Sequence, residues 1–493
     1  MSVIRLLLPA GRPRRWHQTL AAKLIADGHD VGVELREPKT SPSAALLLVE
    51  QLETLLHRRD PVGADDAVSM REYAGAEIGD ADLTFDLTGD PTPIAGAIAP
   101  LYDGHFGEAA RDLALMEGRA PEIALAASEG RRCLARGRPA IERPRLLASG
   151  RAAVESCLTT LIRVAAMAGA PEAEPLEAAA RLGAASPIAF LAIGLAEAAR
   201  RRLTKIVSRE GHWRIGWRAL DGAPDTLDAL AWPAGEPWRW FPDDGQRYFA
   251  DPFPLEQDGV TYVFCEEYPY ATARGLISMF TLDANGRASA ARPVLERPYH
   301  LSYPVVFRHD GRVWMMPESS ANSTLELYVA ESFPDRWRLH ATLLSGLSIS
   351  DATMFAHRGR WWLTGATAEP GVSTWDSLAL YSSDSPVGPW RPSSPLPVLV
   401  DASAARPAGH VVCRNGALWR PAQDCTRGYG SGLSLCRIDE LGEGVFRQTV
   451  ARRLAAPAGA PGEGVHTLNR LGPIEVIDAV GPAARNWRSR EVA

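Results

Sequence analysis

Cysteine is rare in this sequence, with six residues among 493. No two of them have the spacing of a C-x-x-C pair, which excludes the usual signature of structural zinc sites and thiol–disulfide enzymes. So low a cysteine density in a long chain is typical of a reducing compartment. We therefore predict a cytoplasmic protein without a zinc centre of that type.

Long apolar runs and a strong charge of one sign are also missing. The opening strand is too short for a signal peptide and lacks a cleavage-site pattern, and the apolar stretch 187–198 is too short to cross a bilayer. The formal net charge is −6, which gives no reason to propose nucleic acid or an anionic membrane as a partner. We expect a soluble protein without an integral membrane segment, and attachment through a partner protein stays open.

A glycine-rich nucleotide loop is the third absence. The strand at 3–9 runs into Pro9-Ala10-Gly11-Arg12-Pro13, which is not a dinucleotide fingerprint, so we expect no cofactor. A strand, the helix at 14–27 and a second strand form a βαβ unit. Trp16 and His17 begin this helix, where a cap-and-packing pair is favoured over a ligand contact. Later elements are expected as a helix at 44–58 and strands at 81–89, 121–125 and 132–139.

These patterns predict three segments. Residues 1–150 would form an α/β domain, and 151–208 a connector of alanine-rich helices packed against it. The connector helix at 172–202 is expected to break at Pro187. From about Trp213 onward tryptophan becomes dense, and we assign residues 209–493 to an all-β domain.

One hairpin pattern recurs through this last segment. Its clearest copy leads from Ala250-Asp251-Pro252-Phe253 through Asp258-Gly259 to Glu266-Glu267, and Asp-Gly between two β-rich runs is a strong hairpin signal. Copies begin at Tyr303, Asp351 and Ala408, each with a glycine eight residues later. A weaker fifth copy runs from His466 to Ile477. A period of about 50 residues with several strands per unit is typical of a β-propeller blade, so we predict five blades.

The ordered motifs of this segment resemble one family. They are Ala250–Phe253, Glu266–Tyr268, Tyr299–Pro304, Pro317–Ser319, Asp351–Thr353, Arg406–Gly409 and Arg420–Cys425. Together they are similar to the propeller domain found at the N-terminus of plant glucosamine inositolphosphorylceramide transferases and in bacterial relatives. The resemblance covers about half of the chain. That domain in turn is similar to the five-bladed propellers of glycoside hydrolases that cleave arabinans, xylans and fructans.

Three departures limit what the resemblance implies. In the plant enzymes the transferase chemistry is thought to lie in a separate exostosin-like domain, which we do not recognise in this sequence. Asp251 matches the hydrolases' base, but Tyr303 stands where they have a second acid. Asp351 begins the third blade, and no obvious glutamate takes the place of their proton donor. The hydrolase mechanism is therefore not carried over whole.

The N-terminal half is faintly similar to formyltransferase-type α/β domains, through its opening strand-helix-strand and through Asp103-Gly104 with Gly107-Glu108. The Asn, His and Asp set that formyl transfer needs is not recognisable. The resemblance therefore implies a catalytically degenerate domain.

Repeat symmetry would bring the blade starts together around the propeller axis. We predict Asp251 as base or hydroxyl-orienting group, with Glu318 or Asp351 as the partner acid. Clustered carboxyls raise one another's pKa and so could supply the protonated acid that glycoside cleavage needs. Alternatively, the acids brace the channel by accepting backbone N–H groups. The predicted sugar-binding side chains are Glu267, His300, Tyr303, Arg406, His410, Gln423, Asp424 and His466.

The histidines at blade starts could be read as a metal site. Their spacing follows the repeat, however, and not ligand geometry, so we assign no metal. Calcium at Glu266-Glu267 is disfavoured. The leading hypothesis is a carbohydrate-active protein of glycan or glycolipid synthesis or remodelling, of glycosidase or glycosyltransferase type. The alternatives are a non-catalytic glycan-binding or scaffold module for a partner glycosyltransferase, and a sugar N-formyltransferase whose propeller recognises the acceptor.

Overall fold

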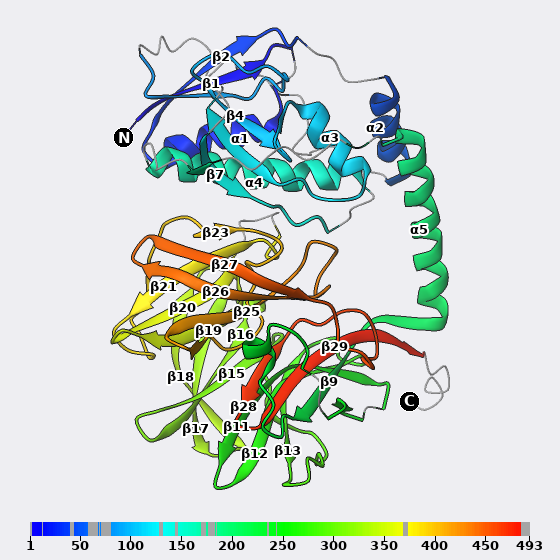
Figure 1. The fold of residues 1–493 in the computed structure, drawn as a ribbon, viewed down its shortest axis with the longest axis vertical. Coiled ribbons are helices and arrows are strands. Elements are labelled where there is room, and N and C mark those ends of the chain that lie inside the picture. The colour runs from blue at the N-terminus through cyan, green and yellow to red at the C-terminus, as the bar shows by residue number, and fades with distance from the viewer. Residues whose placement is uncertain are drawn as a thin grey trace. The chain divides into compact units, whose positions relative to one another are not determined.

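The computed structural model divides the chain into two compact units, Met1–Ala199 and Arg200–Ala493. It describes residues 2–484 except 12, 40–43, 58–67, 69, 71–79, 128–131, 143–145, 169–173, 176–182, 184, 234–235, 243 and 368–372. Helix α5 (Pro187–Val207) runs across the division (Figure 1).

The first unit is an α/β domain built on one mixed sheet. Its strand order is β2-β1-β3-β4-β6-β7-β8, with β5 paired to β4. The strands are β1 (Val3–Pro9), β2 (Asp30–Arg36), β3 (Leu83–Asp86), β4 (Ile98–Tyr102), β5 (His105–Phe106), β6 (Ile123–Ala127), β7 (Arg132–Gly137) and β8 (Glu174–Pro175). The first four core strands pair in parallel, and β6 turns antiparallel to β4. The predicted βαβ opening is confirmed.

Four helices accompany this sheet in the first unit. They are α1 (Arg15–Ala26), α2 (Ala44–His57), α3 (Glu108–Met116) and α4 (Leu147–Ala168). Helix α4 contacts α1, α3 and β7, so it belongs to the body of the domain. In α1 the side chain of Leu20 is fully buried.

The region predicted as a helix over 172–202 differs from that expectation. Glu174 and Pro175 form strand β8, which pairs with β7, and part of the remainder lies outside the described residues. Pro187 begins α5 and does not break a longer helix. Proline is favoured at the first helical position because the N–H that it lacks would have no intrahelical partner there.

The second unit is a five-bladed propeller, as the repeat predicted (Figure 1). Blade 1 contains β11 (Arg247–Gln257), β12 (Val260–Pro269), β13 (Leu276–Leu282) and β14 (Arg292–Leu295). Blade 2 contains β15 (Ser302–His309), β16 (Arg312–Ser319), β17 (Thr324–Ser332) and β18 (Arg336–Ser345). Blade 3 contains β19 (Ile349–His357), β20 (Arg360–Thr367), β21 (Ser377–Ser383), β22 (Arg391–Pro392) and β23 (Leu399–Val400). Blade 4 contains β24 (Val412–Arg414), β25 (Ala417–Gln423), β26 (Leu433–Gly442) and β27 (Val445–Leu454).

Blade 5 closes the ring with strands from both ends of the unit. Its order is β10-β9-β29-β28, from β9 (Ser208–Ala219), β10 (Arg239–Trp240), β28 (Leu468–Leu471) and β29 (Ile474–Ala484). The buried Arg218 on β9 donates to Glu475 on β29 at 2.6 Å, and Glu475 also accepts the backbone N–H of Thr226, at the start of the short helix α6 (Thr226–Ala229). The sequence indicated the β28–β29 hairpin but not its pairing with β9.

Aromatic and aliphatic side chains fill the spaces between blades. Trp362 of β20 packs in one buried cluster with Leu418 of β25, and Trp361 packs against Phe307 of blade 2. Both tryptophans therefore pack between blades. The first strands are innermost, since β11 contacts β15 and β28.

Candidate active site at the blade starts

The first strand of blades 1 to 3 carries the same irregularity. Asp251, Tyr303 and Asp351 have φ values of 53°, 44° and 51°, in the left-handed region that non-glycine residues rarely adopt. At each, the register to the second strand slips, for example between Ala250 and Phe253. Such a bulge redirects a side chain and takes its backbone N–H out of the ladder. Three blades therefore present a strained residue at an equivalent place, a feature of functional sites.

Carboxylates accept the N–H groups that these bulges release. The N–H of Asp251 donates to Asp478, that of Tyr303 to Asp251, and that of Asp351 to Glu318, at 2.9, 3.2 and 2.9 Å. A buried N–H without a partner would be costly. The bracing role considered for the acids is thus present in the structure, and it places several carboxylates side by side.

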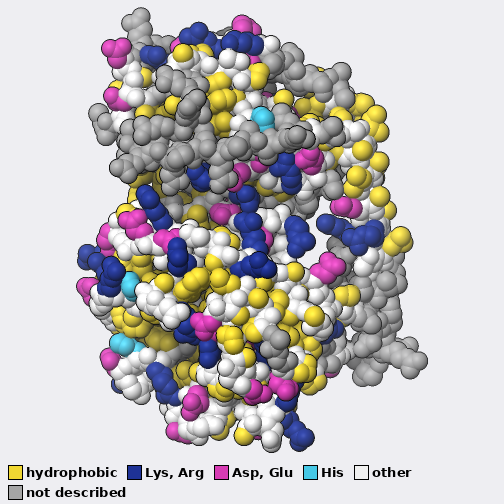
Figure 2. Space-filling model, in the orientation of Figure 1, with side chains coloured by type: hydrophobic (Ala, Val, Ile, Leu, Met, Phe, Trp, Pro, Cys, Tyr) yellow, Lys and Arg dark blue, Asp and Glu magenta, His cyan; other side chains and the backbone are white. Residues whose placement is uncertain are grey.

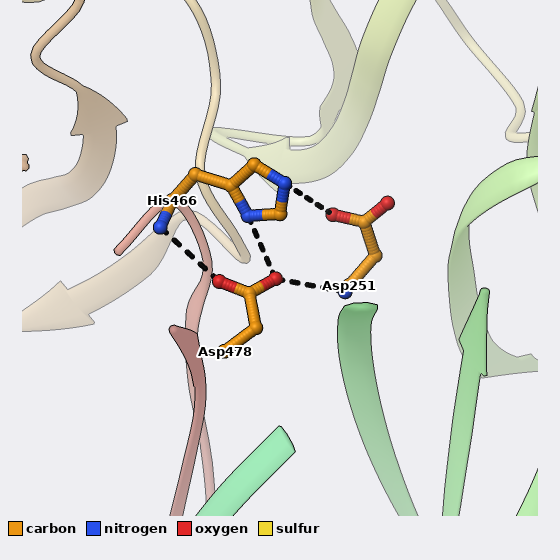
Figure 3. A group of neighbouring side chains, drawn as sticks. All are labelled: Asp251, His466 and Asp478. Carbon is orange, nitrogen blue, oxygen red and sulfur yellow. Dashed lines mark hydrogen bonds and ion pairs between the residues drawn. The ribbon is translucent and has the colours of Figure 1, made fainter. Parts of the chain in front are cut away.

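Asp251, His466 and Asp478 form one buried relay (Figure 3). The Nδ1 of His466 lies 2.7 Å from Asp478, and its Nε2 lies 3.8 Å from Asp251. The ring stacks on Trp213 with 3.7 Å between centroids. Burial opposes protonation of His466, but Asp478 and Asp251 outweigh it and raise its pKa. The two carboxyls therefore favour the protonated form of the imidazole that faces Asp251.

A cation is a poor fit for this trio, although three of its ligand-type atoms lie within 4.8 Å of one another. Asp478 already accepts the backbone N–H groups of Asp251, His466 and Thr467 and pairs with the imidazole. These donors already occupy the Asp478 oxygens that a bound metal ion would need. The donor set favours a hydrogen-bonded relay.

Asp251 is the predicted base, and its surroundings suit that role. Its Oδ1 accepts from Thr467 at 3.0 Å, and Oδ2 accepts from the Tyr303 N–H. Burial raises the pKa of Asp251 to about 6, although the field of His466 opposes the rise. A general base is most effective when its pKa lies near the working pH.

Asp351 is held by two side chains of blade 4. Arg406 Nε and Gln423 Nε2 both donate to its Oδ2, at 2.6 and 2.7 Å. Burial raises the pKa of Asp351 to about 8 against the opposing field of Arg406. The structure therefore brings together the predicted residues Asp351, Arg406 and Gln423. Arg406 and Asp351 form an ion pair beside the other acids.

Glu266 is an acid that the sequence reasoning did not single out. It stands fifteen residues after Asp251, as Glu318 does after Tyr303 and Gln423 after Ala408. Its Oε1 lies 3.3 Å from Tyr248 Oη and from His300 Nε2. Burial, reinforced by Asp251 and Glu318, raises the pKa of Glu266 well above its ordinary value.

Glu267, predicted to bind substrate, lies on the other face of β12. It accepts from Arg247 and Ser278, each at 2.5 Å. Successive side chains of a strand point to opposite faces, so only one of the two glutamates can join the cluster. The repeat spacing would have identified Glu266.

His300, which is predicted to bind the sugar, lies beside Glu266. The Gly275 N–H donates to its Nδ1 at 2.9 Å, so the neutral ring carries its proton on Nε2, directed at Glu266. Burial lowers the pKa of His300, which favours this neutral form. The other predicted acid, Glu318, accepts from Ser320 and Ser350 as well as from the Asp351 N–H.

Tyr303 fills the place of the second acid and crosses to other blades. Its hydroxyl lies 3.0 Å from Thr353 of blade 3 and accepts the Gly409 N–H at 2.6 Å. His410 packs edge-on against Phe253, and burial lowers its pKa to about 4. Tyr303 and His410 therefore stabilise the inner wall of the propeller ring.

Asp424 does not join the cluster. It accepts from the Thr426 N–H and hydroxyl at 3.0 and 2.6 Å, an arrangement typical of a turn. Arg420 donates to the backbone oxygens of Ala404 and Ala405. Its guanidinium therefore stabilises a loop of its own blade.

Aromatic residues border the acids on the solvent side. Tyr429 is 38% exposed. The centroid of its ring lies 5.3 Å from that of His466 and 5.7 Å from that of Trp375. The Arg406 guanidinium lies 5.0 Å from the same ring. Exposed aromatic faces beside carboxylates suit a ligand with both hydroxyl groups and an apolar face.

The first unit has a separate cleft, of about 340 Å³ including open solvent, at the carboxyl end of β3. Trp16, Asp86, Tyr102 and Glu108 are among its lining residues, and the described lining residues include no lysine or arginine. His17 accepts the Arg14 N–H at 2.9 Å, which confirms the predicted cap. The cleft does not offer the cations that a phosphate group would need.

Fold and site together define a five-bladed propeller with an acid cluster at its blade starts. Residues 240–458 match the family described as glucosamine inositolphosphorylceramide transferase 1, N-terminal, and this confirms the resemblance seen in the sequence. The transferase 1 of that name from Oryza sativa subsp. japonica is 30% identical over 258 residues, covering 48% of this chain and 34% of that protein. The one from Arabidopsis thaliana is 31% identical over 259 residues, with the same coverage. The chain thus spans about a third of the length of these curated relatives.

Solved glycoside hydrolases are similar to the chain at a low level. CoXyl43, a β-xylosidase/α-arabinofuranosidase from a compost metagenome, is 13% identical with a TM-score of 0.37, covering 49% of this chain and 92% of that chain. Zg3597, a family 117 hydrolase from Zobellia galactanivorans, is 13% identical with a TM-score of 0.35, covering 54% and 90%. Likeness at this level assigns no residue a role. Among the helices that the structure describes, none combines the length and apolarity needed to span a bilayer.

Proposed function

We propose that the acid cluster of the propeller binds a sugar and that a glycosyl group is transferred or hydrolysed there. One observation carries the proposal: Asp251 and Glu266 are both buried, both have a pKa raised mainly by burial, and the Asp251 charge adds to the rise at Glu266. Clustered acids of this kind are costly to bury and gather at functional sites.

The two acids suit different roles. Asp251 is positioned by Thr467 and Tyr303 and faces His466, so it acts as the base. Burial and the Asp251 charge raise the pKa of Glu266 well above its ordinary value, which favours its protonated form, and it acts as the proton donor. Its Oε2 makes no hydrogen bond with any residue that the structure describes. Inverting glycoside cleavage needs one acid and one base of this kind.

The substrate class follows from the aromatic border and from the relatives. Tyr429 and the half-buried Trp375 offer ring faces to the apolar side of a sugar. The similar plant proteins are named glucosamine inositolphosphorylceramide transferase 1. We therefore favour a glycolipid substrate, with an amino sugar as the transferred group.

A second candidate is a non-catalytic glycan-binding module that serves a separate transferase. It is favoured by the bracing contacts, since Asp251 and Glu318 each accept a backbone N–H of the following blade. Under this reading the acids orient hydroxyl groups and hold the ring together without chemistry.

The deciding experiment compares Glu266→Gln, Asp251→Asn and Glu267→Gln with the wild type. Each is incubated with oligosaccharides and with sugar-nucleotide and inositol-phospholipid acceptor pairs, and products are followed by NMR. We expect a loss of activity of at least about 100-fold for the first two variants and near wild-type activity for Glu267→Gln. Loss in Glu267→Gln alone would refute the assignment of Glu266.

A negative result is also informative. Ligand line-broadening without product from any form would favour the binding module. Folate-dependent formyl transfer that survives Asp251→Asn would instead place the activity outside the propeller, as the N-formyltransferase hypothesis predicts. That hypothesis, the cytoplasmic location, and the segment boundaries at 150 and 208 stay predictions.

A further inference from the structure

Helix α5 carries an apolar stripe that no described residue covers. Ile188, Leu195 and Leu203 are 75%, 53% and 66% exposed. Ala192 and Ala199, also exposed, lie between them. With 3.6 residues per turn, these five positions fall on one side of the helix. A soluble helix normally buries such a stripe.

Near its N-terminus, α5 is anchored on the opposite side. Phe190 is 1% exposed, and it lies about half a turn away from the stripe on the helix surface. This contact fixes the start of the helix and leaves the stripe facing outward. Exposed leucine and isoleucine at helical spacing indicate a binding surface.

Three consecutive arginines lie near the C-terminal end of the stripe, between Ala199 and Leu203. Arg200, Arg201 and Arg202 are all exposed, and none makes an ion pair with a residue that the structure describes. Arg200 and Arg202 flank the stripe, because successive residues are 100° apart around a helix. Figure 2 shows hydrophobic side chains gathered along α5, next to a group of basic ones.

We propose that α5 lies in the interface of a membrane that contains anionic lipid. The stripe would enter the boundary between headgroups and acyl chains, and the arginines would meet lipid phosphates or carboxylates. A helix of this length with an apolar face, flanking arginines and modest overall apolarity is suited to lie on a bilayer and not to cross it. The unpaired cations select an anionic membrane over another apolar surface, such as a second copy of this chain.

Vesicle flotation with the full chain tests this. The probes are vesicles of phosphatidylcholine alone and of phosphatidylcholine with about a third phosphatidylserine. We expect binding to the anionic vesicles that weakens as salt is raised, and little binding to the neutral ones. Replacing Arg200 and Arg202 with glutamine should weaken binding by roughly 25-fold, at about five-fold for each cation beside the stripe.

The apolar side is tested by Ile188→Glu with Leu203→Glu, and Leu339→Glu serves as the matched control, because Leu339 is 41% exposed on the propeller strand β18. We expect the double variant to lose vesicle binding by more than ten-fold and the control to keep it. Circular dichroism checks that each variant is folded, and the arginine variant leaves the stripe intact.

Three outcomes would overturn the proposal. They are absence of wild-type binding to anionic vesicles, equal binding by the double variant, and a wild-type dimer without vesicle binding that the double variant makes monomeric. The last would assign the stripe to a second copy of the chain. None of these readouts depends on sugar chemistry, so the proposed function and this surface can fail separately.

Discussion

Replacing Asp251 with asparagine should stabilise the folded protein while it removes activity. The pKa of this carboxyl rises from 3.8 to about 6 on folding, mainly through burial. Between those values the native state binds more protons than the unfolded chain, so stability falls as pH rises from below 4 to above 6. The full cost is about 3 kcal/mol at neutral pH.

Asparagine avoids that cost because it never ionises. Its amide oxygen can accept the Tyr303 N–H as the carboxylate does, and its amide can donate to Thr467, which now donates to Asp251. The variant should therefore equal the wild type below pH 4 and exceed it by about 3 kcal/mol above pH 6. For a unit of this size that is a rise of about 5 °C in melting temperature.

Thermal unfolding of both proteins between pH 4 and 7.5 provides the assay. Asp310→Asn is the control, because Asp310 lies in an exposed hairpin turn with a positive φ that asparagine accepts. Its difference from the wild type should stay near zero at every pH. A stability difference for Asp251→Asn that does not change with pH, or that is destabilising at neutral pH, would refute the reasoning.

Three further substitutions test other parts of the site. His466→Gln removes the positive charge that lowers the pKa of Asp251, so the acidic limb of the pH–rate profile should move up by about one pH unit; an unmoved limb would exclude Asp251 as the base. Asp478→Asn puts an NH2 group where Oδ2 now accepts the Asp251 N–H and pairs with the His466 ring, and it should cost about 2–5 kcal/mol in denaturant unfolding, so a loss below about 1 kcal/mol would contradict the relay. Tyr429→Ala should raise KM roughly three- to ten-fold with little change in kcat, whereas an unchanged KM would argue against stacking.

The propeller was predictable because its signals are local and repeated. Each hairpin has a turn glycine at one spacing, and apolar residues alternate along its strands. Repetition also predicted that Asp251, Tyr303 and Asp351 would be equivalent, and the structure gives all three a left-handed backbone. A bulge of that kind has no certain sequence signature, because aspartate and tyrosine are also found in regular strands.

The choice between Glu266 and Glu267 depended on packing. Both end the same strand, and a shift of one residue exchanges the face that each occupies. Arg247 and Ser278 hold Glu267 on one face, which leaves Glu266 beside Asp251. Glu266 follows Asp251 at the same spacing as Glu318 follows Tyr303, and this shared spacing already favoured Glu266 over Glu267. Only the register of the bulge shows that a residue at this spacing lies beside the blade start.

By itself, the sequence determined the number of blades, the order of their hairpins and the identity of the residues at the first three blade starts. These depend on turn chemistry and on alternation, which act over a few residues. Tertiary structure decided the rest. The relay of Asp251, His466 and Asp478 joins residues more than 200 positions apart, and blade 5 forms only when β29 meets β9. Ring closure thus assembles the site, because the same strand that completes the last blade carries the carboxylate that positions His466.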